Sequence, residues 1–265
     1  MELFRFRRGT SPLLVSVPHA GTYLPVELRA RLTEDALALP DTDWHVDRLY
    51  DFLDALGASV LVATHSRYVI DLNRPPDNAS LYPGQDTTGL VPIDTVARAD
   101  VYLPGEAPGE REVNARREQY WRPYHDALGR ELERLRAEHG YALLWDAHSI
   151  PSEVPRFFAG RLPDLNVGTN GGVSCAPGIA AAVFTAAKEA AGYSAVLNGR
   201  FKGGYITRHY GRPAGRTHAI QLELSQRTYM DEPPPFAFRD DLAAKVRPGL
   251  WRMLEACLRA AAASA

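Results

Sequence analysis

Cysteine is scarce in this protein, which contains two in 265 residues, Cys175 and Cys257. Because they form no Cys-x-x-Cys pair, the sequence argues against a cysteine zinc site and against a disulfide framework. A reducing cytoplasm is the natural compartment for such a protein.

An excess of charge and a long apolar run are also missing. Lys plus Arg number 30 and Asp plus Glu 32, for a net charge of −2. A nucleic-acid-binding surface normally needs a basic excess, so nucleic acid is not an expected partner. No stretch reaches the roughly 20 apolar residues that span a membrane, and residues 1–12 lack the apolar run of a signal peptide. We therefore expect a cytoplasmic protein without a membrane partner, whose oligomeric state does not follow from the sequence.

The composition is that of a globular protein, with 45% hydrophobic and 23% charged residues, and the length favours one domain over residues 1–265. Apolar runs predict strands at 13–17, 59–63, 69–72, 141–145, 195–197 and 219–224. Apolar residues at helical spacing predict helices over 43–56, 110–139, 179–191 and 240–263, with kinks possible at Pro123 and Pro248. Residues 75–109 and 151–178 read as loops. This alternation predicts an α/β fold with a central mixed, mainly parallel β-sheet flanked by helices.

Two histidines lie close to the ends of predicted strands. His19 follows the strand 13–17 and His148 follows the strand 141–145, where ligands bind in open α/β sheets. A lone histidine is more often a structural residue, but two in matching positions beside acids favour a metal site, zinc above all. Asp146 could fix the tautomer of a histidine, or it could serve in a turn.

A third metal ligand is expected among the acids of residues 41–47. Asp41 or Asp43 could equally cap the helix that follows. Asp47 lies one turn further on and faces the same side as Asp43. The sequence alone does not choose among these acids, and His45 is an outside candidate for a fourth ligand.

Two other charged residues are candidates for chemistry. Glu223 lies within an apolar strand, where a carboxylate is costly to bury without a partner. It is either paired with an arginine or a general base. Arg74 offers a planar fork for a substrate carboxylate, or it forms a structural salt bridge to Asp71 or Asp77.

Residues 203–211 are rich in glycine and carry Tyr205, Arg208 and His209. Glycines flanking aromatic and basic side chains are typical of a mobile substrate-binding loop. A plain hairpin with exposed polar residues would have a similar sequence.

Taken together, these stretches resemble the N-formylglutamate amidohydrolase family. The resemblance runs over nearly the whole sequence in the order of the family, and its specificity lies in the ordered set rather than in one motif. The matching stretches are residues 16–21, 41–47, 67–76, 146–149, 161–169, 203–211 and 218–225. The family is similar in fold to zinc carboxypeptidases and the aspartoacylase group.

That wider group binds zinc through two histidines and one acid, binds the substrate carboxylate with an Asn-Arg pair, and uses a glutamate as base. The resemblance therefore implies His19 and His148 as metal ligands of a divalent ion, first of all Zn²⁺. It implies Asn73 and Arg74 as the substrate-binding pair and Glu223 as the base. Arg208 would hold a second substrate carboxylate.

The sequence departs from the wider group at the acid ligand. The short His-x-x-Glu arrangement is absent, because Thr22 stands where the acid would be. The resemblance favours Asp43 in its place, with Asp47 in reserve.

The implied reaction is metal-dependent hydrolysis of N-formyl-L-glutamate to formate and L-glutamate, as in one route of histidine degradation. A related deacylase acting on an acetyl or succinyl amino acid would share the same metal ligands. A non-catalytic protein that binds carboxylates is the third interpretation, and it predicts no bound metal.

Overall fold

One seven-stranded sheet forms the centre of the computed structural model, which describes residues 1–264. The strand order is β1-β3-β2-β4-β7-β5-β6. Strands β3, β2, β4 and β7 are parallel, whereas β1 and β5 run antiparallel to β3 and β7, respectively. The mixed, mainly parallel sheet is thereby confirmed. The strands are β1 Phe4–Arg7, β2 Leu13–Val17, β3 Ser59–Ala63, β4 Ala142–Ile150, β5 Leu165–Gly168, β6 Ala195–Leu197 and β7 Thr217–Ser225.

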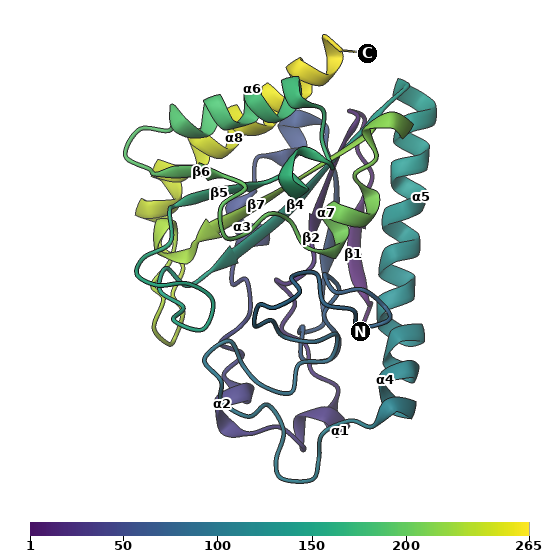
Figure 1. Cartoon of the computed structure of the whole chain (residues 1–265), viewed down its shortest axis with the longest axis vertical. Helices are drawn as coiled ribbons and strands as arrows, with labels where there is room; N and C mark the ends of the chain where they lie inside the picture. The colour runs from purple at the N-terminus through teal and green to yellow at the C-terminus, as the bar shows by residue number, and fades with distance from the viewer. Residues whose placement is uncertain (265) are drawn as a thin grey trace.

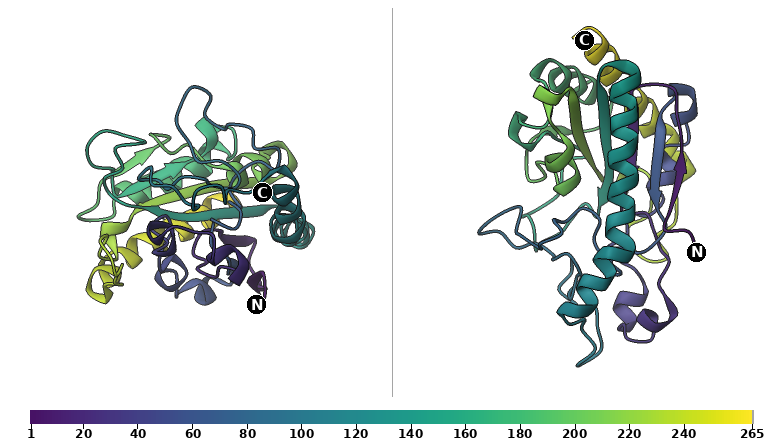
Figure 2. Two further views of the ribbon diagram at one scale, coloured as in Figure 1. Left: turned by 90° about the horizontal axis from the view of Figure 1, so that it is seen from below. Right: turned by 90° about the vertical axis from the view of Figure 1, so that its right-hand side faces the viewer.

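Helices flank this sheet (Figure 1). Helices α6 and α8 pack side by side, and the long helix α5 packs along β4, β2 and β3 (Figure 2). Within residues 1–264, no helix combines the length and apolarity needed to cross a bilayer. The helices are α1 Val26–Arg29, α2 Glu34–Leu37, α3 Val46–Leu49, α4 Glu110–Arg116, α5 Arg122–His139, α6 Pro177–Lys188, α7 Tyr205–Tyr210 and α8 Asp240–Ala262, with short 3-10 turns at Leu53–Leu56, Asn170–Gly172, Pro213–Gly215 and Gln226–Thr228.

Two hydrophobic cores lie on the two faces of the sheet. Side chains alternate between faces along a strand, so Leu13, Val15 and Val17 of β2 join the core under α6 and α8. Leu14 points the other way, into the core that includes α5. In β4, Trp145 belongs to the first core and Leu144 to the second.

Five of the six predicted strands are correct in position, although not all in extent. The predicted strand 141–145 continues as β4 to Ile150, because the polar residues after Trp145 pair fully with β7. Strands β1 and β5 were missed. The predicted strand 69–72 is wrong: this run is buried without a strand partner, and Arg116 donates hydrogen bonds to the Tyr68 and Val69 carbonyls.

The helix predictions need two corrections. Residues 43–56 form the short α3 and a 3-10 turn rather than one helix. His45, with a left-handed φ of 62°, delays the start of α3, and Tyr50, with a ψ of 37°, ends it. The predicted helix 110–139 is interrupted by a π turn at Arg117–Trp121, next to Pro123. The predicted last helix continues through Pro248. Residues 75–109 contain no helix or extended strand, as expected, and lie with α1 and α2 at the end of the molecule opposite the C-terminus (Figure 1).

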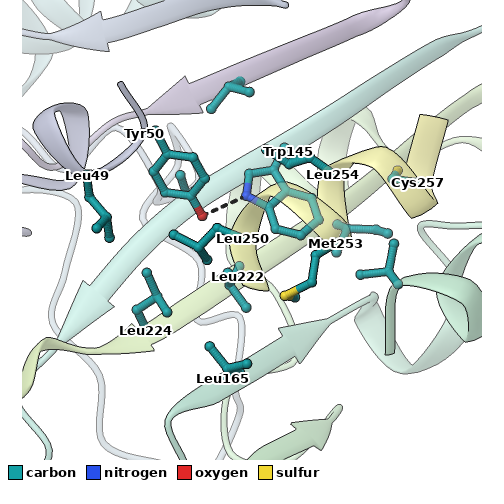
Figure 3. Close-up of a cluster of buried hydrophobic side chains, with 14 of the residues drawn as sticks. Leu49, Tyr50, Trp145, Leu165, Leu222, Leu224, Leu250, Met253, Leu254 and Cys257 are labelled. Carbon is teal, nitrogen blue, oxygen red and sulfur yellow. Dashed lines mark hydrogen bonds between the residues drawn. The ribbon is translucent and has the colours of Figure 1, made fainter. Parts of the chain in front are cut away.

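A buried hydrogen bond fixes the larger core. The Trp145 indole N–H donates to the Tyr50 hydroxyl at 3.0 Å, among leucines of β7 and α8 (Figure 3). Trp145 is fully buried and Tyr50 is 3% exposed. The bond therefore ties the segment after α3 to the centre of the sheet.

We expect Tyr50→Phe to destabilise the protein, because it leaves the Trp145 N–H buried without an acceptor. Such a loss costs about 1–3 kcal/mol, measurable as a lower free energy of unfolding in urea. Tyr141→Phe is the matched control, since Tyr141 is half-buried against the same core and its hydroxyl has no hydrogen bond within residues 1–264. Equal stability of the two variants would contradict the prediction.

Candidate active site

The pairing of β4 with β7 brings four buried polar side chains together. The register sets Asp146 opposite Gln221 and His148 opposite Glu223. All four continue the side-chain alternation of Leu144, so they face the same side of the sheet, towards the carboxyl ends of the strands. A patch of acids, an amide and an imidazole thus replaces the apolar core at this point.

Next to this patch, His19, Asp43 and His148 form a compact buried cluster. Each offers one ligand atom, and these atoms lie within 4.8 Å of one another. Asp43 Oδ2 lies 3.0 Å from His148 Nδ1 and 3.7 Å from His19 Nδ1. The Asp43 backbone N–H also donates to the His19 carbonyl at 3.0 Å, which ties the two segments together.

One further carboxylate lies next to the Nε2 atom of each imidazole. His19 Nε2 lies 2.7 Å from Asp71 Oδ1, and His148 Nε2 lies 3.1 Å from Asp146 Oδ1. At His19, the Asp71 carboxylate that accepts the Nε2–H leaves Nδ1 unprotonated, as a metal ligand must be. Two Nδ1 atoms and one carboxylate oxygen facing each other fit a divalent metal ion, with zinc suited to this donor set.

The charges around the cluster favour a cation. Burial lowers the pKa of His148, but Asp146 and Asp43 outweigh it and raise that pKa well above its usual value. Burial and the nearby Arg67 lower the pKa of His19. The Asp146 and Asp43 carboxylates thus stabilise positive charge at His148, whereas the lowered pKa of His19 favours its neutral form, as a metal ligand requires.

Glu223 is the acid beside the cluster that is not held by a cation. Its carboxylate accepts a hydrogen bond from Gln221 Nε2 at 2.9 Å and forms no salt bridge within residues 1–264. The alternative of a buried pair with arginine is therefore not observed. Burial raises the pKa of Glu223 to about 8, so this carboxyl group can gain or lose a proton near neutral pH.

Asn73 and Arg74 leave the cluster in different directions. Asn73 Nδ2 lies 2.9 Å from His148 Nε2, and its Oδ1 accepts the Ile206 N–H at 2.8 Å. A Cβ on Gly204 would clash with the Asn73 amide, so this close approach requires glycine. Arg74 donates to the carbonyl and hydroxyl oxygens of Thr88, at 2.8 and 2.9 Å, and to the Asn73 carbonyl.

The other candidates for the acid ligand lie outside the cluster. Asp47 pairs with Arg5 at 2.5 Å, and its side chain is 32% exposed. His45 Nε2 donates to the Phe236 carbonyl at 2.8 Å. Neither Asp41 nor Asp43 is the N-cap residue of α3, because that position is His45, whose side chain accepts no capping hydrogen bond. Of the acids considered, Asp43 is the one that faces both histidines.

The expected substrate loop at 203–211 is a short helix, α7, and three of its candidates lie elsewhere. Tyr205 and His209 stack on each other with ring centroids 4.8 Å apart. Arg208 donates to the Gly203 carbonyl, and its guanidinium lies over the Tyr82 ring. None of these three lines the cavity at the cluster, to which this segment contributes Gly204. The expectation that they bind substrate there is not supported.

The cavity has a volume of about 620 Å³, and His19, Asp43, His148 and Glu223 line it together with Asn73 and Arg74. The sequence interpretation missed several other lining residues. Most come from loops without periodicity, where no pattern marks them. They are Arg67, Arg98, Arg156, Phe157, Arg200, Phe201 and Gln221. Asp71 was recognised only as a partner for Arg74, although it had the same signal as Glu223, a carboxylate in an apolar run.

Comparison with known families gives a match over most of the sequence. Residues 11–230 match the family model described as N-formylglutamate amidohydrolase. Relatives named N-formylglutamate deformylase from Pseudomonas aeruginosa and Pseudomonas putida are 54% and 53% identical over 257 residues. The matches cover 97% of this chain and 96% of each relative.

Solved structures give the same result for the fold. N-formylglutamate amidohydrolase from Ralstonia eutropha is 26% identical, with a TM-score of 0.82 over 98% of this protein and 97% of that one. Gene product Atu2144 from Agrobacterium tumefaciens, at 18% identity, has a TM-score of 0.70 over 97% and 95%. Both neighbours share the α/β architecture.

We expect Asp43→Asn and His148→Ala to lose bound metal, because each removes one ligand of a three-ligand site. Metal content per protein molecule, measured by mass spectrometry after dialysis against buffered zinc, checks this. Asp47→Asn is the matched control and should retain the metal, since Asp47 pairs with Arg5 at the surface. Full occupancy in a folded Asp43→Asn protein would rule out this acid ligand.

Proposed function

The chain belongs to the N-formylglutamate amidohydrolase family, and from this we propose that it hydrolyses N-formyl-L-glutamate to formate and L-glutamate, using a zinc ion bound by His19, Asp43 and His148. The observation that carries the proposal is the position of Glu223. It lies opposite His148 on the next strand, lines the same cavity and has no cationic partner within the described residues.

The chemistry follows from these groups. A divalent ion held by the cluster would polarise the formyl group and make a water molecule more acidic. Glu223 accepts the proton lost by the attacking water as the new C–O bond forms. It then donates this proton to the amide nitrogen as the C–N bond breaks. With a pKa raised to about 8 by burial, the carboxyl group is suited to return a proton.

Arg74 is the proposed partner of the substrate α-carboxylate. Thr88 and Asn73 accept three of its hydrogen bonds and fix the plane of the guanidinium. Arginine has five N–H donors, so donors remain for a ligand. Because Arg74 also lies 3.7 Å from Asp71, its charge is held close to the residues that orient His19.

Family membership favours a hydrolase over a non-catalytic carboxylate-binding protein. A deacylase for acetyl or succinyl amino acids would share the metal ligands, but the two Pseudomonas relatives are named as deformylases. A role in histidine degradation and a cytoplasmic location stay predictions.

We expect formate release from N-formyl-L-glutamate with a kcat/KM at least about tenfold above that for N-acetyl-L-glutamate. An extra methyl group in a fitted acyl pocket is worth about 10–200-fold in discrimination. A coupled assay for formate and a parallel assay for released glutamate measure the two reactions. A preference for the acetyl or succinyl compound would replace the deformylase by the related deacylase.

We expect Glu223→Gln to retain the metal but to lose most turnover, because the amide has nearly the same shape and cannot accept a proton. General acid–base catalysis contributes about 10²–10⁴-fold, so kcat should fall within that range. Glu153→Gln is the control, since Glu153 also lines the cavity but pairs with Arg161 and is 61% exposed. A kcat for Glu223→Gln within about threefold of the parent would reject Glu223 as the base.

A further inference from the structure

The cavity contains an arginine that no part of the mechanism above uses. Arg200 follows β6 and lines the cavity. Its Nε donates to the Phe157 carbonyl at 2.7 Å. Within residues 1–264, its two terminal nitrogens form no hydrogen bond or salt bridge with the protein. Donors that face a cavity without a protein acceptor are available to a ligand.

The other arginines of the cavity are already engaged with acids. Arg67 pairs with Asp71 at 2.5 Å, and Arg98 pairs with Asp86 at 2.6 Å. Arg156 binds Asp86 and also Asp94, at 2.8 and 2.9 Å. Arg74 is held by Thr88, as described above. Arg200 is therefore the lining arginine whose charge lacks a carboxylate among residues 1–264.

Aromatic side chains hold the guanidinium of Arg200 in place. Its central carbon lies 5.4 to 5.5 Å from the ring centroids of Tyr82, Phe157 and Phe201. Together with the hydrogen bond from Nε, these contacts restrict the arginine before any ligand arrives. Apolar neighbours also exclude water, which strengthens an interaction with an anion. The outer edge of the guanidinium remains as a planar fork that matches a carboxylate.

Arg200 and Arg74 are fixed by different hydrogen-bond acceptors in the cavity wall. Arg74 contacts Asn73 and Asp71, which also contact the metal-ligand histidines. Arg200 contacts Tyr82 and the aromatic residues after β4 and β6, and none of the residues that orient the histidines. A substrate with its amide at the cluster and one carboxylate at Arg74 would direct a second carboxylate to another part of the wall.

We propose that Arg200 binds the γ-carboxylate of the substrate and thereby selects acidic N-formyl amino acids over neutral ones. The proposal rests on the proposed deformylase function and replaces Arg208 in the role expected from the sequence. It also accounts for charge: a substrate with two carboxylates meets Arg74, which keeps free donors beside Asp71, and Arg200, which has no carboxylate partner within residues 1–264.

The test compares Arg200→Ala with the parent on N-formyl-L-glutamate and N-formyl-L-glutamine. The two substrates have nearly the same shape and differ in the charge at the γ position. Loss of one charge-assisted pair should lower kcat/KM for N-formylglutamate by about ten- to a hundredfold, mostly through KM. The value for N-formylglutamine should fall by less than about threefold. Arg200→Lys should lose less than Arg200→Ala, because it keeps the charge without the fork.

Arg98→Ala is the matched control. It removes another cavity arginine, and Arg156 still pairs with the Asp86 carboxylate. The ratio of the two kcat/KM values should stay that of the parent. Equal losses on both substrates in Arg200→Ala would make Arg200 a residue that merely shapes the wall and would overturn the proposal. Unchanged kinetics on both would overturn it as well.

A binding measurement separates this proposal from the proposed function. Glutarate carries two carboxylates and butyrate one, and calorimetric titration of the metal-loaded protein needs no turnover. We expect Arg200→Ala to bind glutarate about tenfold or more weakly and butyrate with the affinity of the parent. If the parent releases no formate from N-formylglutamate, the deformylase function fails, and the glutarate titration still decides the role of Arg200. Should Arg200→Ala not fold, Arg200→Gln serves in the same comparison, because it keeps the stem that packs on the rings.

Discussion

The parallel pairing of β4 with β7 is the constraint on which the site depends. These two nine-residue strands are paired along their whole length in the middle of the sheet. A shift of one residue in the register of either strand would turn each of its side chains to the opposite face of the sheet. Trp145 and Leu222 would then leave the larger core, and His148 and Glu223 would enter it. The burial of apolar residues on one face therefore fixes the catalytic geometry on the other.

Buried acids are the second determinant of the site. Asp43, Asp71 and Asp146 are each at most 2% exposed, and a buried carboxylate is costly unless a cation or hydrogen-bond donors face it. Burial raises the pKa of Asp71, but Arg67 and His19 outweigh it and hold that pKa well below its usual value. The same arrangement orients both histidines. The contacts that stabilise the buried acids therefore also orient the histidines that would bind the metal.

Sequence patterns predicted the sheet, its mixture of parallel and antiparallel strands and the helices that cover it, because buried positions recur at regular intervals along strands and helices. They also indicated His19 and His148, and a local excess of acid drew attention to Asp43. Four features could not be read from the pattern. Strand β4 continues beyond Trp145, but its polar residues there break the apolar run by which a strand is recognised. Choosing Asp43 over Asp47 required the turn at His45, which a helical pattern does not reveal. Arg200 lies in a loop, where no period distinguishes a ligand-facing residue from an exposed one, and Tyr205 and His209 sit in a glycine-rich segment that turned out to pack elsewhere.

The π turn before α5 sets the rotational phase between two halves of one long helix. Beyond it, Tyr124 contacts β2 through Ser16; within it, Trp121 donates to the Arg74 carbonyl; before it, Arg116 holds the carbonyls of Tyr68 and Val69. Each α-helical residue advances the direction of the side chains by about 100°. Deleting one residue from the turn would rotate α4 by that angle and swing Arg116 away from the segment that leads to Asp71 and Asn73. The length of this helix is therefore constrained, because a single-residue deletion in the π turn would displace residues that support the cavity wall.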